Sequence, residues 1–106
     1  MSDENVQDID IYEDIEIEEY GKANKEVPKA SNYLLRIDKT KYKTSEFLLT
    51  GSQLLVMALK KPIEQYKLYK KLHGGQRIEI LPDTLVDLRE KGIERFQTVP
   101  LGETEG

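Results

Sequence analysis

The sequence predicts an α+β domain in which a mixed sheet of four to five strands packs against one helix. Its 106 residues are enough for a single domain. Several short runs place apolar residues at every second position, which is typical of half-buried strands. The segment from Thr50 to Lys60 instead begins with a helix cap and continues with consecutive apolar residues. A glycine pair at 74–75 separates two of the strand runs and predicts a hairpin turn.

The predicted central hairpin runs from Tyr66 to Ile80. Its first strand contains Leu68 and Leu72, and in its second strand Ile78 and Ile80 alternate with charged residues. Consecutive glycines supply the positive φ angles that a tight hairpin turn requires. A phosphate-binding loop is disfavoured, because no Gly-Lys-Ser/Thr follows the glycines and no helical pattern begins there.

Two further strands are expected before this hairpin. In residues 33–38, Tyr33, Leu35 and Ile37 share one face, which predicts a strand with one buried side. A polar turn follows, and residues 42–49 can return beside this strand as the second strand of another hairpin.

The predicted helix begins after Thr50. Thr50 as N-cap with Gln53 at the third helical position forms a capping box, which satisfies two backbone amides. Pro62 marks the latest possible end of the helix, because proline cannot continue a helical hydrogen-bond pattern. The buried face of the helix is expected to contain Leu54, Ala58 and either Leu55 or Leu59.

Residues 84–90 are expected to hold one short helical turn, and residues 95–99 the closing strand, with Phe96 and Thr98 facing inward. Pro100 ends this strand. The element order is then strand, strand, helix, strand, strand, short turn, strand, which is the ubiquitin-like β-grasp arrangement. The predicted core consists of Leu35, Ile37, Leu54, Ala58, Leu68, Ile78, Ile80 and Phe96.

Charge divides the chain into an acidic N-terminal arm and a mildly basic domain. Residues 1–30 contain ten acidic residues and three lysines, a net charge of −7, whereas residues 31–106 carry +3. We therefore expect an arm and linker at 1–31, a folded domain at 32–100, and an extended tail at 101–106.

Four isoleucines lie among the carboxylates of the arm, at Ile9, Ile11, Ile15 and Ile17. Two hypotheses remain open for this segment. A disordered acidic tail would only keep the protein soluble. Alternatively, the arm adds a strand to a sheet edge through backbone hydrogen bonds, either on its own domain as an autoinhibitory cover or on a neighbour, linking protomers.

For strand addition, the expected receiving edge is residues 42–49, including Tyr42 and Thr44. The carboxylates of the arm would then meet basic residues of the domain, which favours encounter and orientation. These basic residues are Lys60, Lys67, Lys70 and Lys71.

Catalytic and metal-binding patterns are not found in the sequence. The absence of cysteine excludes disulfides, thiolate metal sites and thioester chemistry on this chain. His73 is the only histidine and is interpreted as a residue flanking the hairpin turn. The acidic residues around Glu16 lack EF-hand spacing. We expect no metal, no cofactor and no enzymatic activity.

The N-terminal residues MSDENVQD are acidic and contain no apolar core, so a signal peptide is not expected. The longest apolar region, residues 47–59, is too short and too interrupted to span a bilayer. A domain charge of +3 beside an acidic arm disfavours nucleic acid as a partner. The sequence therefore predicts a soluble, cytoplasmic protein.

Five segments occur in an order that resembles the prokaryotic multiubiquitin family, bacterial ubiquitin-like domains found singly or in tandem. They are YLLRIDKTKY (33–42), LTGSQLL (49–55), PIEQYKL (62–68), LHGGQRIEI (72–80) and VDLREKGIERFQTVP (86–100). The resemblance covers about two thirds of the chain, leaves the acidic arm outside, and also implies the ubiquitin-like β-grasp fold.

The resemblance further implies chemistry at Gly106. In ubiquitin-like modifiers the terminal glycine carboxylate is adenylated by an E1-like activating enzyme. It then passes to cysteines of that enzyme and of an E2-like conjugating enzyme, and finally to an amine. Glycine suits a narrow active site because it has no Cβ. Two departures are evident: no terminal Gly-Gly is present, and Glu103 and Glu105 replace the basic residues of the ubiquitin tail.

The same resemblance implies a JAB-type deconjugating peptidase as a further partner and a role in phage defence, by analogy alone. The alternative is a non-conjugated interaction or assembly module that works through its sheet edge and acidic arm.

Overall fold

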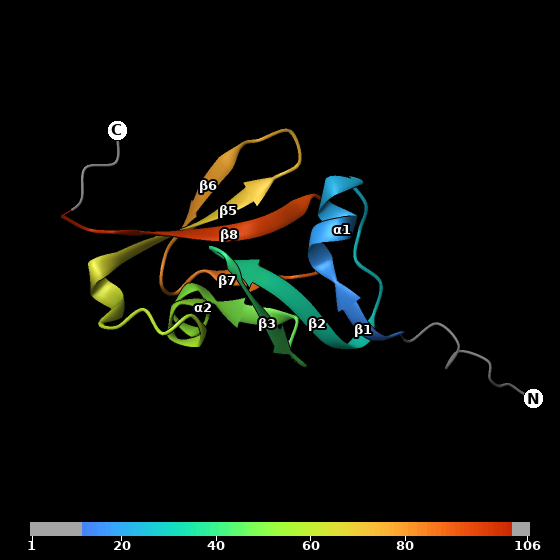
Figure 1. The fold of residues 1–106 in the computed structure, drawn as a ribbon, viewed down its shortest axis with the longest axis horizontal. Coiled ribbons are helices and arrows are strands. Elements are labelled where there is room, and N and C mark those ends of the chain that lie inside the picture. Colours follow the sequence, from blue (N-terminus) through green and yellow to red (C-terminus); the bar gives the residue numbers. More distant parts are fainter. Residues whose placement is uncertain (1–11, 103–106) are drawn as a thin grey trace, which may run out of the picture.

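A mixed sheet forms the main layer of the fold (Figure 1). The computed structural model describes residues 12–102, which contain six strands in this sheet and two in a smaller one. The elements before the central hairpin are β1 (Tyr12–Glu16), α1 (Ile17–Lys22), β2 (Ala30–Ile37), β3 (Thr40–Thr44), β4 (Leu48–Thr50) and α2 (Gly51–Met57). They are followed by the 3₁₀ turn η2 (Ile63–Gln65), β5 (Tyr66–Leu72), β6 (Arg77–Ile80), β7 (Leu85–Asp87) and β8 (Ile93–Pro100).

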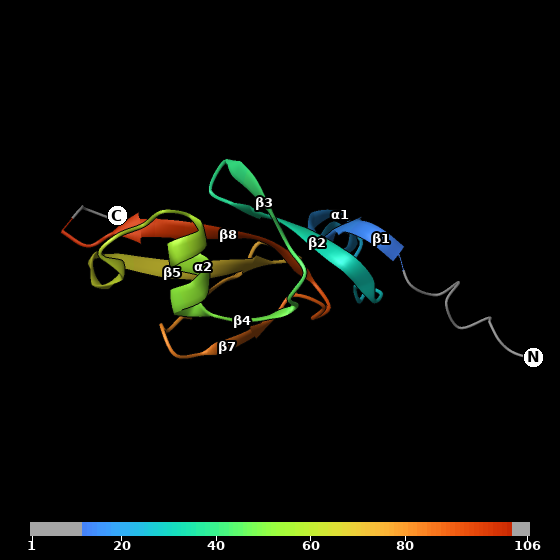
Figure 2. The same ribbon diagram turned by 90° about the horizontal axis from the view of Figure 1, so that it is seen from below.

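Two antiparallel hairpins flank the last strand. β2 pairs with β3, and β5 pairs with β6. Between the hairpins lies β8, which is antiparallel to β5 and parallel to β2. Figure 2 shows α2 crossing one face of this sheet, with β4 and β7 forming an antiparallel pair beside it. This arrangement confirms the predicted ubiquitin-like β-grasp fold.

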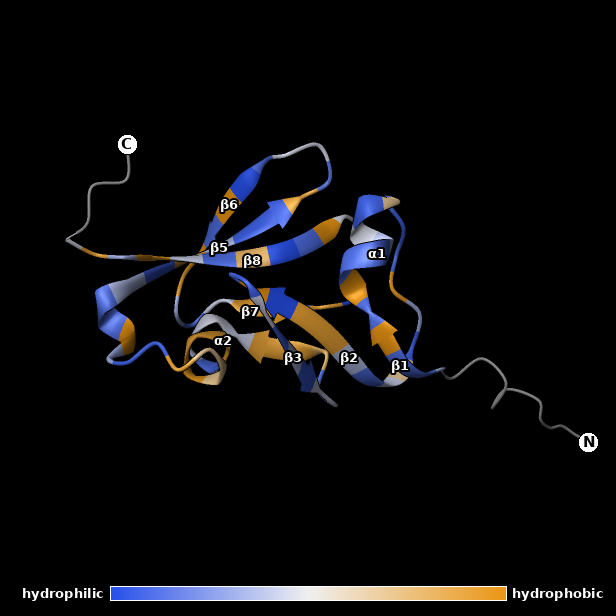
Figure 3. Ribbon diagram, in the orientation of Figure 1, coloured by the Kyte–Doolittle hydropathy of each residue, from blue (hydrophilic) through white to orange (hydrophobic). Residues whose placement is uncertain are grey.

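The core lies between the sheet and α2. Tyr33, Leu35 and Ile37 are buried on one face of β2, as their alternation predicts, and Phe96 is fully buried on β8. Figure 3 shows that β2 is largely apolar whereas β5 is mostly polar, although Leu68 of β5 reaches the core. The buried residues of α2 and its C-terminal cap are Gly51, Leu54, Leu55 and Ala58.

Local signals for the helix and the turn are confirmed. Thr50 accepts a hydrogen bond from the Gln53 backbone N–H at 3.1 Å, and the Gln53 side chain accepts one from the Thr50 backbone N–H at 2.8 Å. The helix ends at Met57, and Leu59 leaves it at a φ of 61° with its side chain exposed, so Leu55 completes the buried face. Gly74 and Gly75 have φ angles of 93° and 95° in the hairpin turn.

Three expectations are wrong in detail. Residues 42–49 do not form one strand, because β3 ends at Thr44 and a separate strand, β4, begins at Leu48. Residues 84–90 hold β7 rather than a helical turn, because β7 completes its hydrogen bonds with β4. Ile78, predicted to be buried, is 38% exposed. Ile78 lies two residues closer to the hairpin turn than Ile80, and Ile80 is the residue that packs against the start of α2.

Neither α1 nor α2, nor any other helix in residues 12–102, is long and apolar enough to cross a bilayer.

Replacing Phe96→Ala should lower the free energy of unfolding by about 3–5 kcal/mol, because a fully buried aromatic side chain leaves a cavity. Small domains have a total stability of about 5–15 kcal/mol, so chemical denaturation should show a large shift of the midpoint. Val56→Ala is the control, since Val56 is exposed on α2 and its truncation should change stability by less than about 0.5 kcal/mol. Similar midpoints for the two variants would contradict the central position of β8.

Candidate functional site

The described part of the acidic arm folds onto its own domain. β1 lies parallel to β2, with Ile15 opposite Tyr33 and Glu16 opposite Leu34. The Tyr12 backbone N–H extends this pairing by donating to the Lys29 carbonyl oxygen at 3.1 Å. Strand addition therefore occurs within the chain for residues 12–16. Two of the four predicted isoleucines, Ile9 and Ile11, lie outside the described residues.

The receiving edge differs from the one expected. Tyr33 and Leu34 of β2 each pair with a residue of β1 and also with a residue of β3. A strand residue has one neighbour on each side, so β1 and β3 must lie on opposite edges of β2. The receiving edge is the β2 segment 30–34, not residues 42–49 with Tyr42 and Thr44. It is available because, within residues 12–102, β8 pairs with β2 only at Ile37.

Apolar residues anchor the arm. Ile15 and Ile17 are both buried, and Val27 of the connection to β2 is buried with them. The Val27 backbone N–H donates to the Arg89 carbonyl oxygen at 3.2 Å, and Arg89 Nε donates back to the Val27 carbonyl at 2.9 Å. The predicted linker, residues 21–31, therefore contains the end of α1, the buried Val27 and the start of β2.

The helix of the arm packs closely against the closing strand. A Cβ added to Gly21 of α1 would lie 1.9 Å from the carbonyl oxygen of Ile93 in β8. No side chain fits at that distance, so glycine at this position permits the contact.

The carboxylates of the arm meet cations of β2 and β3. Glu18 is 5% exposed and accepts a hydrogen bond from Arg36 Nε at 2.9 Å, with Lys22 at 3.5 Å. Burial acts to raise the pKa of Glu18, but the Arg36 hydrogen bond and the Arg36 and Lys22 charges outweigh it, so the pKa is lowered.

Two ion pairs extend this pattern along the arm. Asp14 lies 3.3 Å from Lys43, and Glu16 forms an ion pair with Lys41. A hydrogen bond from Asn32 and the contact with Lys43 lower the pKa of the exposed Asp14 carboxyl. The alternation of β3 could have identified Lys41 and Lys43 as one charged row, but the sequence does not show which edge the arm uses.

The lysines predicted to meet the arm lie elsewhere. Lys60 Nζ is 4.0 Å from Asp38 and 5.6 Å from the centre of the Tyr66 ring. Lys70 Nζ pairs with Glu90 at 2.9 Å. Lys67 and Lys71 alternate along β5 with the buried Leu68, which places them on the sheet face opposite α2.

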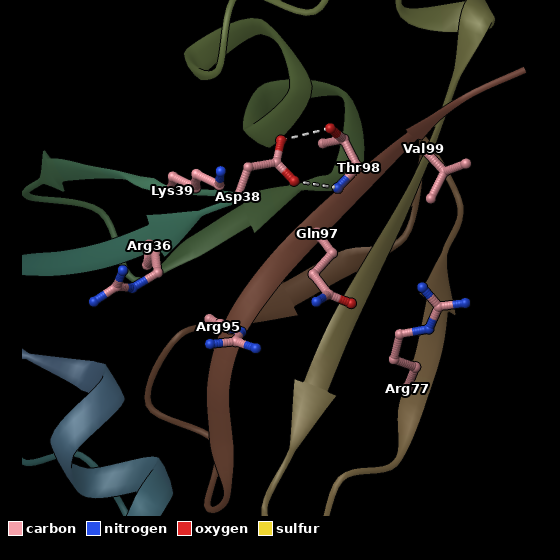
Figure 4. A pocket seen from close by; sticks show the side chains of 8 residues that line it. All are labelled: Arg36, Asp38, Lys39, Arg77, Arg95, Gln97, Thr98 and Val99. Atoms are coloured by element: carbon pink, nitrogen blue, oxygen red, sulfur yellow. Dashed lines mark hydrogen bonds between the residues drawn. The ribbon is translucent and has the colours of Figure 1, made fainter. Parts of the chain in front are cut away.

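That opposite face carries a shallow cavity of about 460 Å³ (Figure 4). β2, the turn after it, β6 and β8 all contribute to its walls. The lining residues are Arg36, Asp38, Lys39, Arg77, Arg95, Gln97, Thr98 and Val99. Thr98 fixes Asp38 by donating its backbone N–H at 2.9 Å and its hydroxyl at 2.6 Å. Four cations and one carboxylate thus surround this cavity.

In residues 12–102, no group of three or more His, Cys, Asp and Glu side chains is placed to hold a metal ion. The His73 backbone N–H donates to the Gly92 carbonyl at 2.7 Å, so the histidine flanks the hairpin turn as interpreted from the sequence.

The closing strand leads out of the sheet at Pro100. The Leu101 backbone N–H donates to the Gln65 carbonyl oxygen at 2.7 Å, and Gly102 follows with a φ of 89°. Both residues are exposed, and Figure 1 shows this end of β8 on the side of the molecule away from β1 and α1. The proposed conjugation residue, Gly106, lies outside the described residues.

The fold and the exposed end of its last strand define a ubiquitin-like protein. The family model described as Multiubiquitin matches residues 33–100, well over half of the chain, and the chain belongs to this multiubiquitin family. Ubiquitin-like domains of this kind are generally modifiers or interaction modules rather than enzymes. A search of curated proteins found no match, and a search of solved structures found none either. The arm, including β1 and α1, lies outside the matched residues.

Replacing Gly21→Ala should destabilise the protein by more than about 2 kcal/mol, because the new methyl group collides with the Ile93 carbonyl. Helix propensity alone predicts the opposite sign, a gain of about 1 kcal/mol. Chemical denaturation shows whether the substitution lowers or raises the free energy of unfolding. Amide NMR should show the largest chemical-shift changes in β1, α1 and the start of β2. A stabilised variant would contradict the close packing of α1 on β8.

Replacing Glu18→Gln should reduce the free energy of unfolding at pH 7 by about 1.5–3 kcal/mol, the usual range for a hydrogen bond to a charged group. The folded-state pKa lies below the ordinary value of 4.5. The contribution of the carboxylate is therefore complete above about pH 4.5 and is lost as the pH falls through the folded pKa. The difference from the unmodified protein should shrink in that acidic range.

The matched control is Glu19→Gln, because Glu19 is exposed on the same helix. Its effect on the free energy of unfolding should be within about 0.5 kcal/mol at both pH 7 and pH 3. A Glu18→Gln deficit that is equal at pH 7 and pH 3 would show that the Arg36 contact does not depend on the charge of Glu18.

Proposed function

We propose that this chain is a bacterial ubiquitin-like protein modifier that is joined to target amines through the carboxylate of Gly106. The observation that carries the proposal is its multiubiquitin family membership, combined with a closing strand that delivers the chain to an exposed end of the domain. Four residues follow Gly102 and can span at most about 14 Å when extended.

The proposed reaction has four steps. The Gly106 carboxylate attacks the α-phosphate of ATP on an E1-like enzyme, forming an acyl-adenylate and releasing pyrophosphate. An enzyme thiolate then displaces AMP to form a thioester, which passes to the thiol of an E2-like enzyme. The target amine finally attacks the thioester, loses a proton and releases the thiol. Both thiols must belong to the partner enzymes, because this chain has no cysteine.

The proposed setting is the bacterial cytoplasm, where a JAB-type metallopeptidase would reverse the modification by hydrolysis and where phage defence is the expected role. This part of the proposal depends on analogy with the family.

A second candidate function is a non-conjugated interaction module. The observation that favours it is the cation-lined cavity on the sheet face opposite α2, which requires no reaction at the tail. Self-association through the arm stays a prediction for residues 1–11, since residues 12–16 pair within their own chain.

The test is incubation of the full chain with an E1-like enzyme, ATP and magnesium. Mass spectrometry should detect a thioester adduct that hydroxylamine or thiol removes. Deleting Gly106 should abolish the adduct and leave the melting temperature unchanged, because the residue follows the end of the last strand.

Gly74→Ala is the matched control. Nothing lies within 4 Å of the new methyl group, but the φ of 93° makes the change strained by about 1 kcal/mol. This variant should melt at a lower temperature and still form the adduct. Normal adduct formation by the Gly106 deletion would overturn the conjugation proposal in favour of the interaction module.

A further inference from the structure

The sheet face opposite α2 is polar and rich in cationic side chains. Along β8, Arg95, Gln97 and Val99 line the cavity while Phe96 between them is buried. Along β5, Lys67, Tyr69 and Lys71 alternate with the buried Leu68. We call the surface formed by Arg36, Lys39, Lys67, Lys71, Arg77 and Arg95 the basic face.

Strand pairing brings these cations together. Lys71 of β5 is opposite Arg77 of β6 on one side and opposite Arg95 of β8 on the other. Three positive side chains therefore occupy one row across three strands. Like charges directly opposite each other destabilise a sheet, so this row carries a cost for the isolated domain.

The guanidinium groups of Arg77 and Arg95 can still donate hydrogen bonds to a ligand. Arg77 stacks on the Tyr69 ring, with its Cζ atom 4.3 Å from the ring centre, and this contact holds the side chain against the face. The Arg95 side chain makes no hydrogen bond or ion pair with any residue in 12–102. Asp38, the carboxylate lining the cavity, is already held by Thr98.

A hydrogen-bond acceptor without a partner lies between Arg77 and Arg95. Figure 4 shows Gln97 with Arg95 on one side and Arg77 on the other. The Gln97 Oε1 atom is buried and has no hydrogen-bond partner among the described residues. A buried acceptor left without a donor is costly, so turning the Gln97 side chain outward to meet an N–H group of a ligand relieves this cost.

One carboxylate already binds at the rim of the basic face. Glu18 of the arm is held by Arg36 at 2.9 Å while almost fully buried. Arg36 also lines the cavity, and Figure 4 shows Arg36 and Arg95 on neighbouring strands. Arg77 and Arg95 offer the same chemistry, and neither forms an ion pair with a carboxylate of residues 12–102.

We propose that the basic face binds an acidic, extended peptide segment of another protein. Two carboxylates of the segment accept hydrogen bonds from Arg95 and Arg77, and a backbone N–H between them donates to Gln97 Oε1 after the Gln97 side chain has turned outward. Peptide is favoured over nucleic acid because the whole chain carries a charge of −4 and because Tyr69 is covered by Arg77 and is not available for base stacking. The inference is independent of Gly106 and of conjugation.

The experiment is a titration of the full-length, ¹⁵N-labelled protein with an acetylated, amidated octapeptide of alternating glutamate and serine. Shifts should appear in Tyr69–Lys71, Arg77–Glu79 and Arg95–Val99, together with the Gln97 side-chain amide. Binding should weaken at least fivefold when salt is raised from 50 to 500 mM, because the contacts are ionic. The same peptide with glutamine in place of glutamate should not bind.

The variant that tests the site is Arg77→Gln with Arg95→Gln, which should weaken binding at least tenfold. The matched control, Lys25→Gln with Lys91→Gln, removes the same two charges from exposed positions and should change the affinity less than twofold. Melting temperatures establish that each variant is folded. If the control lowers affinity as much as the test variant, only net charge is being measured and the proposal fails.

Two further outcomes would overturn the proposal. One is the absence of shifts on the basic face at millimolar glutamate peptide. The other is tighter binding of a labelled twelve-residue oligothymidylate than of the peptide at the same salt concentration, which would assign the face to nucleic acid.

Discussion

The incomplete pairing between β2 and β8 is the constraint on which the rest of this structure depends. In the described chain the two strands meet at Ile37 and Phe96 and then diverge. Residues 30–34 of β2 would otherwise expose an unpaired strand edge, and other chains could pair with such an edge. β1 covers that edge, and the arm thereby becomes part of the sheet.

Several other features follow from this placement of β1. The chain must turn at Ile17 to avoid β8, and α1 then packs on the closing strand through Gly21. The turn carries Glu18 to Arg36, so one of the many carboxylates of the arm becomes buried and paired. The arm is held on the domain by two buried apolar residues, Ile15 and Ile17, as well as by its ion pairs. Its charge alone therefore does not explain why it packs against the domain.

The two faces of the sheet serve different purposes. The face below α2 contains Phe96 and Leu68, which belong to the hydrophobic core. The other face carries a row of like charges that a structure selected for stability alone would avoid. In the proposed modifier, this face and the tail would act separately, the first for recognition and the second for attachment. A binding partner that supplies carboxylates would relieve the repulsion in the row.

The sequence by itself determined the local elements, because their causes are local. The glycine pair sets the hairpin turn, the Thr50–Gln53 pair sets the helix start, and the alternation in residues 33–37 identifies a buried strand face. These effects act within a few residues, so they can be recognised without knowing the partner of each strand.

Only the tertiary structure decided which strands meet. The pairing of β7 with β4 replaced an expected helical turn, the position of α2 left Ile78 exposed, and the divergence of β8 from β2 selected the edge that receives the arm. The row of Lys71, Arg77 and Arg95 has both origins. Lys71 and Arg77 face each other across the predicted hairpin, whereas Arg95 comes from β8, more than fifteen residues further along the chain. The approach of Arg95 to this pair is a consequence of non-local hydrogen bonding, which no local pattern encodes.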